Sequence, residues 1–221
     1  FLTAFLFLSL SESSRTALEA LRVCHAATAT LCGAWLLGTS MSLGIIITVI
    51  LIFCLHFFRD PVRQCSADER SIVSPADGKV ISIKEVNDND IGPESILISI
   101  FLNVFNVHTN RMPITGRFQS VQHRPGKFIA AFDHMASDLN EQTEMLIDTK
   151  FGRVKMKQIA GLIARRILCY AQKNLHMKKG DRLGFIRFGS RTDVIVPKSV
   201  TLHVELGQKV TGTETIIGTF K

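Results

Sequence analysis

The chain has 221 residues, a formal net charge of +7, 46% hydrophobic residues and five cysteines, and its length suits one domain plus a further segment. The charge fits an anionic partner, but the single tryptophan, the single tyrosine and the lack of a recognisable nucleic-acid module argue against nucleic acid. Neither the cysteines nor the seven histidines have the spacing of disulfide or metal sites, so we expect reduced thiols and no metal.

The first predicted element is an apolar region, residues 1–58, which we expect to be a hydrophobic helical membrane anchor. No Asp, Glu, Lys or Arg lies between Arg22 and Arg59. A membrane-spanning helix needs about 20 apolar residues, so this run is too long for one helix and barely long enough for two. Residues 38–40 are a candidate turn, which leaves residues 41–58 as the stronger helix.

Two other interpretations of this region fit less well. A cleaved signal peptide would be shorter and would end at a small-residue cleavage site, which is missing before Arg59. A buried hairpin of core helices would show a polar face at helical period, and none is seen. Arginines flank both ends of the run, which favours a cytoplasmic location for both ends. We therefore expect attachment to the cell membrane with the rest of the chain on the cytoplasmic side, by one pass, two passes or shallow insertion.

Residues 59–221 are predicted to form a mainly β domain, a compact antiparallel β-sandwich or barrel-sandwich with few short helices. Apolar and polar residues alternate as in half-buried strands, and β-branched residues are frequent. One short helix is expected near residues 128–141. Strands are expected at 79–86, 95–107, 143–163 (two strands around a turn at 149–152), 194–197 and 200–206, with a last strand ending at Thr219.

Positive charge is concentrated between Lys150 and Arg187, where eleven basic residues accompany a single acid, Asp181. Such a run is often a solvated face. Beside a membrane segment it also attracts anionic lipid headgroups, by about 1 kcal/mol per basic residue near the surface. Anionic membrane lipid is therefore a predicted partner of this chain.

Three short motifs contain residues suited to catalysis, at 74–78 (SPADG), 107–113 (VHTNRMP) and 187–194 (RFGSRTDV). Each is weak by itself. The first suits a tight turn, because Pro, Asp and Gly all favour turns. A lone histidine is more often structural than catalytic, and a Gly-Ser pair is common in loops.

Together the motifs resemble the phosphatidylserine decarboxylase family in its short form, in the family's order and over nearly the whole of residues 59–221. The last segment is the most specific, and the apolar region that ends in FFRDP is similar to the family's membrane anchor. The matching segments are FFRDP (57–61), SPADGKV (74–80), FLNVFNVHTNRMPITG (101–116), RPGKF (124–128), NE (140–141) and KKGDRLGFIRFGSRTDVIVP (178–197).

The resemblance implies a proenzyme that cuts its own chain between Gly189 and Ser190. The Ser190 hydroxyl would attack the Gly189 carbonyl, and elimination and hydrolysis would leave a pyruvoyl group in place of Ser190. Glycine suits the acyl side because it tolerates strained backbone angles. The products would be a larger chain, 1–189, and a smaller chain, 190–221, which would stay together as a heterodimer.

The resemblance also assigns the groups that would assist Ser190, because a serine hydroxyl needs a base that is itself oriented. Asp77 matches the family's aspartate, and His108 matches the first histidine of a family pattern in which a second histidine follows three residues later. Here that second position is Arg111. We therefore leave open whether His108 serves both cleavage and decarboxylation, with His134 as a reserve candidate.

The implied reaction converts phosphatidylserine to phosphatidylethanolamine and CO2, as a step of phospholipid biosynthesis. The pyruvoyl ketone would form a Schiff base with the substrate amine and accept the electrons left by CO2. His108 would return a proton to the substrate carbon. The covalent pyruvoyl at Ser190 would be the only cofactor, with no metal, and related decarboxylases often form homo-oligomers.

Three alternatives remain at this point. A pyruvoyl-dependent decarboxylase of a soluble amino acid would have no need of the apolar region, and its cleavage motif differs. A membrane-anchored β-sandwich carrier without catalysis would leave Asp77, His108 and the Gly189-Ser190 pair without a purpose. An unprocessed relative would keep Ser190 as a plain serine, so cleavage at this bond separates the alternatives.

Overall fold

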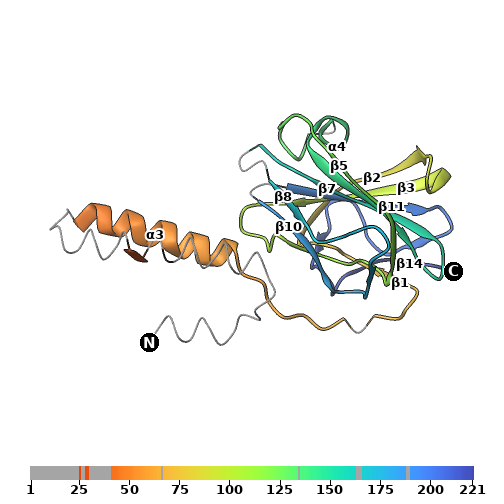
Figure 1. The fold of residues 1–221 in the computed structure, drawn as a ribbon, viewed down its shortest axis with the longest axis horizontal. Coiled ribbons are helices and arrows are strands. Elements are labelled where there is room, and N and C mark those ends of the chain that lie inside the picture. Colours follow the sequence, from red (N-terminus) through yellow and green to blue (C-terminus); the bar gives the residue numbers. More distant parts are fainter. Residues whose placement is uncertain are drawn as a thin grey trace. The chain divides into compact units, whose positions relative to one another are not determined.

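The structure is a computed structural model that describes residues 25, 28–29, 41–65, 67–133, 135–162, 166–187 and 190–221 (Figure 1). The chain divides into two compact units, Phe1–Asp60 and Pro61–Lys221, which are described separately. The predictions at Gly189 and at the reserve candidate His134 lie outside the described residues.

Helix α3 (Met41–Phe57) is the long helix described in the first unit. It contains no charged residue apart from the titratable His56, and its large apolar side chains Ile45, Val49 and Ile52 are exposed. It ends just before Pro61, whose ring disfavours helical backbone at the preceding residue. Among the described residues, no helix reaches the length and apolar character needed to cross a membrane.

The second unit is built from three antiparallel sheets, and its principal sheet has eight strands in the order β13-β2-β3-β11-β7-β6-β5-β9. Two three-stranded sheets, β1-β14-β12 and β4-β10-β8, accompany it (Figure 1). The one helix named in this unit is α4 (Ala136–Leu139). The strands are β1 (Ser71–Val73), β2 (Gly78–Asp88), β3 (Gly92–Leu102), β4 (Thr109–Arg111), β5 (Gly116–Arg124), β6 (Gln142–Asp148), β7 (Arg153–Ile159), β8 (Ile167–Cys169), β9 (His176–Met177), β10 (Arg182–Ile186), β11 (Ser190–Pro197), β12 (Thr201–Leu202), β13 (Lys209–Val210) and β14 (Ile216–Thr219).

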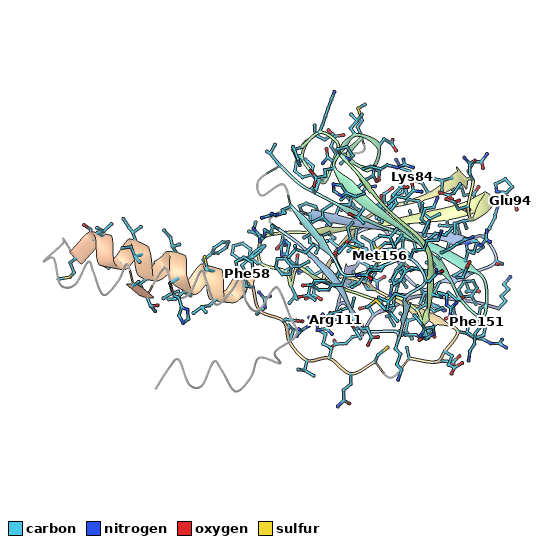
Figure 2. All side chains as sticks on the ribbon, viewed as in Figure 1. Phe58, Lys84, Glu94, Arg111, Phe151 and Met156 are labelled. Carbon is cyan, nitrogen blue, oxygen red and sulfur yellow. The ribbon has the colours of Figure 1, made fainter. Side chains whose placement is uncertain are left out.

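Strand β11 lies in the middle of the principal sheet. It pairs with β3 along its whole length, from Ser190 opposite Leu102 to Pro197 opposite Ser95, and with β7 on its other side. Val194 and Val196 point to one face, where they join a buried apolar cluster with side chains of β2, β3, β1 and β14. A second cluster surrounds Met156, which Figure 2 shows within this unit. Met156 lies opposite Val194 in the strand pairing, so both clusters are on one face of the sheet, and burial of this apolar face fixes the register of β11.

The structure confirms the prediction of a mainly β, antiparallel domain with few helices. The predicted strand at 95–107 is too long, because β3 ends at Leu102. The Asn103 side chain accepts a hydrogen bond from the Phe105 N–H at 2.9 Å, and Asn106 accepts one from the Asn103 N–H at 3.0 Å. These local bonds close a turn and compete with the strand ladder.

Other strands also differ from the sequence-based expectation, since β11 begins at Ser190 and not at residue 194, and β1, β4, β8, β9 and β10 were not predicted. Strand β5 was not predicted, because a bulge between Phe118 and Ser120 breaks the alternation of apolar and polar residues along it. The predicted strand at 200–206 is reduced to β12, and the predicted helix near 128–141 to the single turn α4. Short elements of this kind are held by tertiary contacts that local sequence does not show.

A partly buried ion-pair cluster lies at the end of the sheet away from Ser190, where Lys155 of β7 binds the largely buried Asp88 and the half-exposed Asp90 at 2.6 Å each. Burial acts to raise the pKa of Asp88, but hydrogen bonds from Lys155 and from the Asp90 and Ile91 N–H groups outweigh it and lower that pKa. Burial acts to lower the pKa of Lys155, but the bonds to Asp88 and Asp90 outweigh it and raise that pKa.

The lowered pKa of Asp88 predicts a pH-dependent contribution to stability. A depressed acidic pKa stabilises the fold above the carboxyl's unfolded value, and this contribution is lost as pH falls below about 4. The raised Lys155 pKa sets the upper limit of the window, above about pH 10. We expect Lys155→Met to lower the urea midpoint at pH 7 and to have a smaller effect at pH 3, where the contribution of Asp88 has begun to be lost. An effect of equal size at both pH values would contradict this account.

Candidate active site

Ser190 is the first residue of β11 and is completely buried. Its Cα lies opposite that of Leu102, the last residue of β3, so it stands at the end of the principal sheet. Its Oγ accepts or donates no hydrogen bond within the described part of the chain. A buried hydroxyl without a partner costs about 1–3 kcal/mol, which makes Ser190 an unusual residue for a purely structural position.

His108 is also completely buried, in the segment that follows β3. Its Nδ1 lies 3.0 Å from the carbonyl oxygen of Asn106. A carbonyl oxygen can only accept, so Nδ1 carries the proton of the neutral ring and Nε2 is its basic nitrogen. The ring packs at a tilt against Phe185 of β10, with 6.2 Å between centroids. His108 is therefore held in one orientation by a backbone group and an aromatic ring.

The fold brings His108 and Ser190 to the same end of the principal sheet. The Ile186 N–H at the end of β10 donates to the His108 carbonyl at 3.3 Å, and only three residues separate Ile186 from Ser190. Asn110 follows His108 by two residues, and Thr192 follows Ser190 by two residues. The Asn110 side-chain nitrogen lies 3.5 Å from the Thr192 hydroxyl. Both links place the His108 segment against the start of β11.

Asp77 precedes β2 at this same end of the sheet. Its neighbour Gly78 stands so close to β3 that a Cβ there would lie 2.3 Å from the Phe101 carbonyl oxygen, so only glycine fits. Strand β3 separates β2 from β11, so the backbones of Gly78 and Ser190 are two strand spacings apart, about 10 Å. The Asp77 carboxylate accepts hydrogen bonds from the Arg63 guanidinium at 2.9 Å and from the Gly212 N–H at 2.8 Å.

Arg63 was not predicted as a partner of Asp77. It is one of the arginines that flank the apolar region. Both side chains of this pair are largely buried. Removing one member leaves the other charge buried and unpaired, which costs about 3–5 kcal/mol. Arg63→Ala is therefore expected to lower the free energy of unfolding by that amount, as measured by urea denaturation.

Arg153→Ala is the matched control for this prediction. Its ion pair with Asp148, at 3.0 Å, is half-exposed, and exposed pairs contribute at most about 1 kcal/mol. Equal losses of stability in the two variants would show that the Arg63–Asp77 pair contributes no more than an exposed ion pair.

Arg111, which stands where the family pattern has a second histidine, is bound to the backbone. Its guanidinium donates to the carbonyl oxygens of Gly180 at 3.2 Å and Pro61 at 3.0 Å. It therefore ties the start of this unit to the turn before β10.

Arg191 is a second residue that sequence reasoning did not single out. It follows Ser190 directly, and its buried guanidinium donates to Asp193 and to the Ser99 hydroxyl at 2.6 Å each, and to the Asp133 carbonyl at 3.2 Å. Asp193 in turn accepts a short hydrogen bond from Ser137 of α4. This network fixes the start of β11 to β3 and to the segment before β6. The only signal in the sequence was that an arginine and an aspartate, Arg191 and Asp193, stand two residues apart directly after Ser190.

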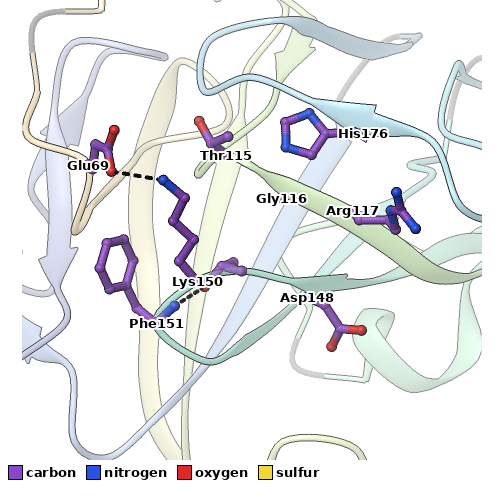
Figure 3. A pocket seen from close by; sticks show the side chains of 9 residues that line it. Glu69, Thr115, Gly116, Arg117, Asp148, Lys150, Phe151 and His176 are labelled. Carbon is purple, nitrogen blue, oxygen red and sulfur yellow. Dashed lines mark hydrogen bonds and ion pairs between the residues drawn. The ribbon is translucent and has the colours of Figure 1, made fainter.

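The cavity drawn in Figure 3 lies at the other end of the sheet, with a volume of about 310 Å³. Lys150 reaches across it to Glu69 at 3.5 Å, and both side chains are mostly exposed. None of the predicted site residues lines this cavity. The described residues contain no group of three or more side chains placed to hold a metal ion.

A sequence profile described as phosphatidylserine decarboxylase matches residues 50–218. A protein of Chlorobium limicola is 44% identical over 77% of this chain and 81% of its own length, and one of Pelobacter propionicus is 45% identical over 85% and 84%. One of Ehrlichia chaffeensis is 45% identical over 80% of each chain. All three are named phosphatidylserine decarboxylase proenzyme.

Proposed function

The chain belongs to the phosphatidylserine decarboxylase family, and from this premise we propose that Ser190 is the residue converted to the pyruvoyl group. The activity is the decarboxylation of phosphatidylserine, and the chain is made as a proenzyme. The finer proposal concerns which residues carry out each step. It rests above all on the buried Ser190 hydroxyl, which has no hydrogen-bond partner in the described residues and lies at the end of the sheet that also holds His108.

The proposed self-cleavage begins when His108 takes the proton of the Ser190 hydroxyl at Nε2. The Ser190 oxygen then bonds to the Gly189 carbonyl carbon as the peptide C–N bond breaks and His108 passes the proton to the Ser190 nitrogen, which gives an ester and a free amine. Loss of the Ser190 Cα proton expels the Gly189 carboxylate and leaves dehydroalanine at position 190. Addition of water and release of ammonia complete the pyruvoyl group. The Asn106 carbonyl supports this role because it fixes the proton of His108 on Nδ1.

Position 190 suits a covalent carbonyl group. It is completely buried, and it stands at a strand end where a new chain terminus can form without breaking the ladder. The pyruvoyl ketone supplies an electron sink for the departing carboxyl group. The protein's own contribution is to orient the substrate amine toward position 190 and to deliver a proton from His108 Nε2 to the substrate carbon.

The smaller chain is expected to stay bound after cleavage. Strand β11 belongs to it, whereas both of its neighbours, β3 and β7, belong to residues 1–189. The Arg191 network adds bonds to Ser99 and Asp133 of the larger chain. We therefore infer a heterodimer of the two cleaved chains, with the sheets packed as a sandwich around the cluster shared by β11, β1 and β14.

We also propose that the apolar region attaches the protein to the cell membrane, with the catalytic domain on the cytoplasmic side. The uncharged helix α3 and its exposed apolar side chains support this proposal. The substrate is a bilayer lipid, so attachment would keep the active site beside it.

A carbonyl-reactive hydrazine tests the assignment to position 190. Incubation of the purified wild type with phenylhydrazine should add one hydrazone to the smaller chain, 190–221, and stop phosphatidylserine turnover. The larger chain should keep its mass. Turnover that stops without a mass change on the smaller chain would place the carbonyl group elsewhere and contradict the assignment.

A further inference from the structure

We propose that four exposed apolar side chains around the Ser190 end of the principal sheet form a lipid-docking surface, by which the catalytic domain itself sits on the bilayer. We call these residues the apolar rim, and they are Phe105, Phe132, Met135 and Leu162. The proposal rests on the proposed position of the active site at Ser190, and it is independent of the apolar region that precedes this unit.

The rim residues come from three separate connections that all leave the same end of the sheet. Phe105 lies in the segment after β3, whose last residue is opposite Ser190. Phe132 and Met135 lie between β5 and β6, and Leu162 follows β7, whose last residue is opposite Arg191. The register of the sheet therefore gathers residues that are distant in sequence around one end.

The rim side chains are unusually exposed for their size, at 66% for Phe105, 65% for Phe132, 58% for Met135 and 55% for Leu162. Single exposed apolar residues are normal on a soluble surface. A group of four around an active site is different, because exposed apolar patches commonly mark interaction surfaces.

The segments that carry the apolar rim contact strand β3 and one another. The Phe132 ring packs edge-on against Phe101 of β3, with 6.0 Å between centroids. Asn140 holds the Ile129 backbone by two hydrogen bonds, at 2.8 and 2.9 Å, and also binds the Ala160 carbonyl at 2.8 Å. These contacts tie the connection that carries Phe132 to β3 and to the segment after β7.

A bilayer is the partner that this chemistry fits best. The established substrate has two acyl chains that remain in a membrane, so its headgroup can reach position 190 only if this end of the sheet faces the lipid. Aromatic, Met and Leu side chains insert readily at the acyl boundary. Lys127 and Arg166 are exposed on the same connections and suit anionic headgroups, although the exposed Asp133 and Asp138 partly offset them.

The first experiment compares two forms of the same substrate in the full-length protein. The variant F105S/F132S/M135S should lose at least about tenfold in kcat/KM on phosphatidylserine in vesicles, because each buried apolar side chain contributes more than a factor of ten in affinity. It should keep wild-type activity on a soluble short-chain phosphatidylserine. Since Phe105 lies near His108, M135S/L162S serves as a second variant with the same expected split.

Leu175→Ser is the matched control, because Leu175 is 41% exposed but bonds through its carbonyl to Phe118, near the other end of β5. It should leave both activities unchanged. Equal activity of the rim variants and wild type on vesicles would overturn the lipid-docking surface. A wild type inactive on both substrates would instead contradict the proposed function.

A second experiment reads contact with lipid directly. Phe132→Trp in a Trp35→Phe background should be quenched by brominated phosphatidylcholine vesicles, whereas Leu175→Trp in that background should not. Absence of quenching at position 132 would overturn the proposal. Absence of quenching together with a change in oligomeric state of the rim variants would instead assign the rim to a second copy of this chain.

Discussion

Ser190→Ala is expected to leave the protein as one chain of 221 residues and to reduce phosphatidylserine decarboxylation to background. The substitution removes the side-chain oxygen that would attack the Gly189 carbonyl, and alanine has no hydroxyl to replace it. The variant should fold, because the Ser190 hydroxyl makes no hydrogen bond within the described residues and alanine keeps the buried Cβ. Denaturing gel electrophoresis and an assay of phosphatidylethanolamine formation measure the two effects.

Ser82→Ala is the control for this prediction. Ser82 is a buried serine on β2, in the same sheet as Ser190 but outside the proposed site. This variant should be cut and active like the wild type. A Ser190→Ala protein that is still cut, or that still decarboxylates the lipid, would rule out the proposed origin of the pyruvoyl group.

His108→Ala is expected to lower the rates of self-cleavage and of decarboxylation by about 10²–10⁴-fold each, the usual contribution of a positioned general acid or base. The His108 ring is oriented by the Asn106 carbonyl and by Phe185, so its Nε2 is prepared for proton transfer. Steady-state kinetics on phosphatidylserine should show the loss mainly in kcat. Intact mass of the same sample shows whether cleavage is lost as well.

The two readouts separate the tasks that the sequence left open. Loss of both cleavage and turnover would assign both tasks to His108. Normal cleavage without turnover would assign the cleavage base to another group. His123→Ala is the control, because His123 is a half-exposed histidine on β5 that contacts Thr143 at 3.2 Å, and it should leave both readouts unchanged.

Regular alternation of apolar and polar residues made β2, β6 and β7 predictable, and the uncharged run made α3 predictable. These are elements whose pattern is contained within their own residues. Strand β5 escaped because its bulge shifts the alternation by one residue. Strand β3 was drawn too long because β-branched and aromatic residues continue into a turn that asparagine side chains close.

The candidate site likewise contains residues that local sequence motifs predicted and residues that they did not. Ser190, His108 and Asp77 were selected from local motifs, and the structure places all three at one end of the principal sheet. Their catalytic roles remain proposals. Arg63 and Arg191 were missed as supporting residues because their partners, Asp77 and Ser99, are distant in the sequence. Such contacts arise only when the strands are assembled.

Intact-mass analysis of the purified wild-type protein tests the central claim most directly. We predict two chains, of which the smaller has the mass of residues 190–221 with a pyruvoyl group in place of Ser190. A single chain with the mass of the unmodified 221-residue sequence, in a preparation that decarboxylates phosphatidylserine, would contradict it.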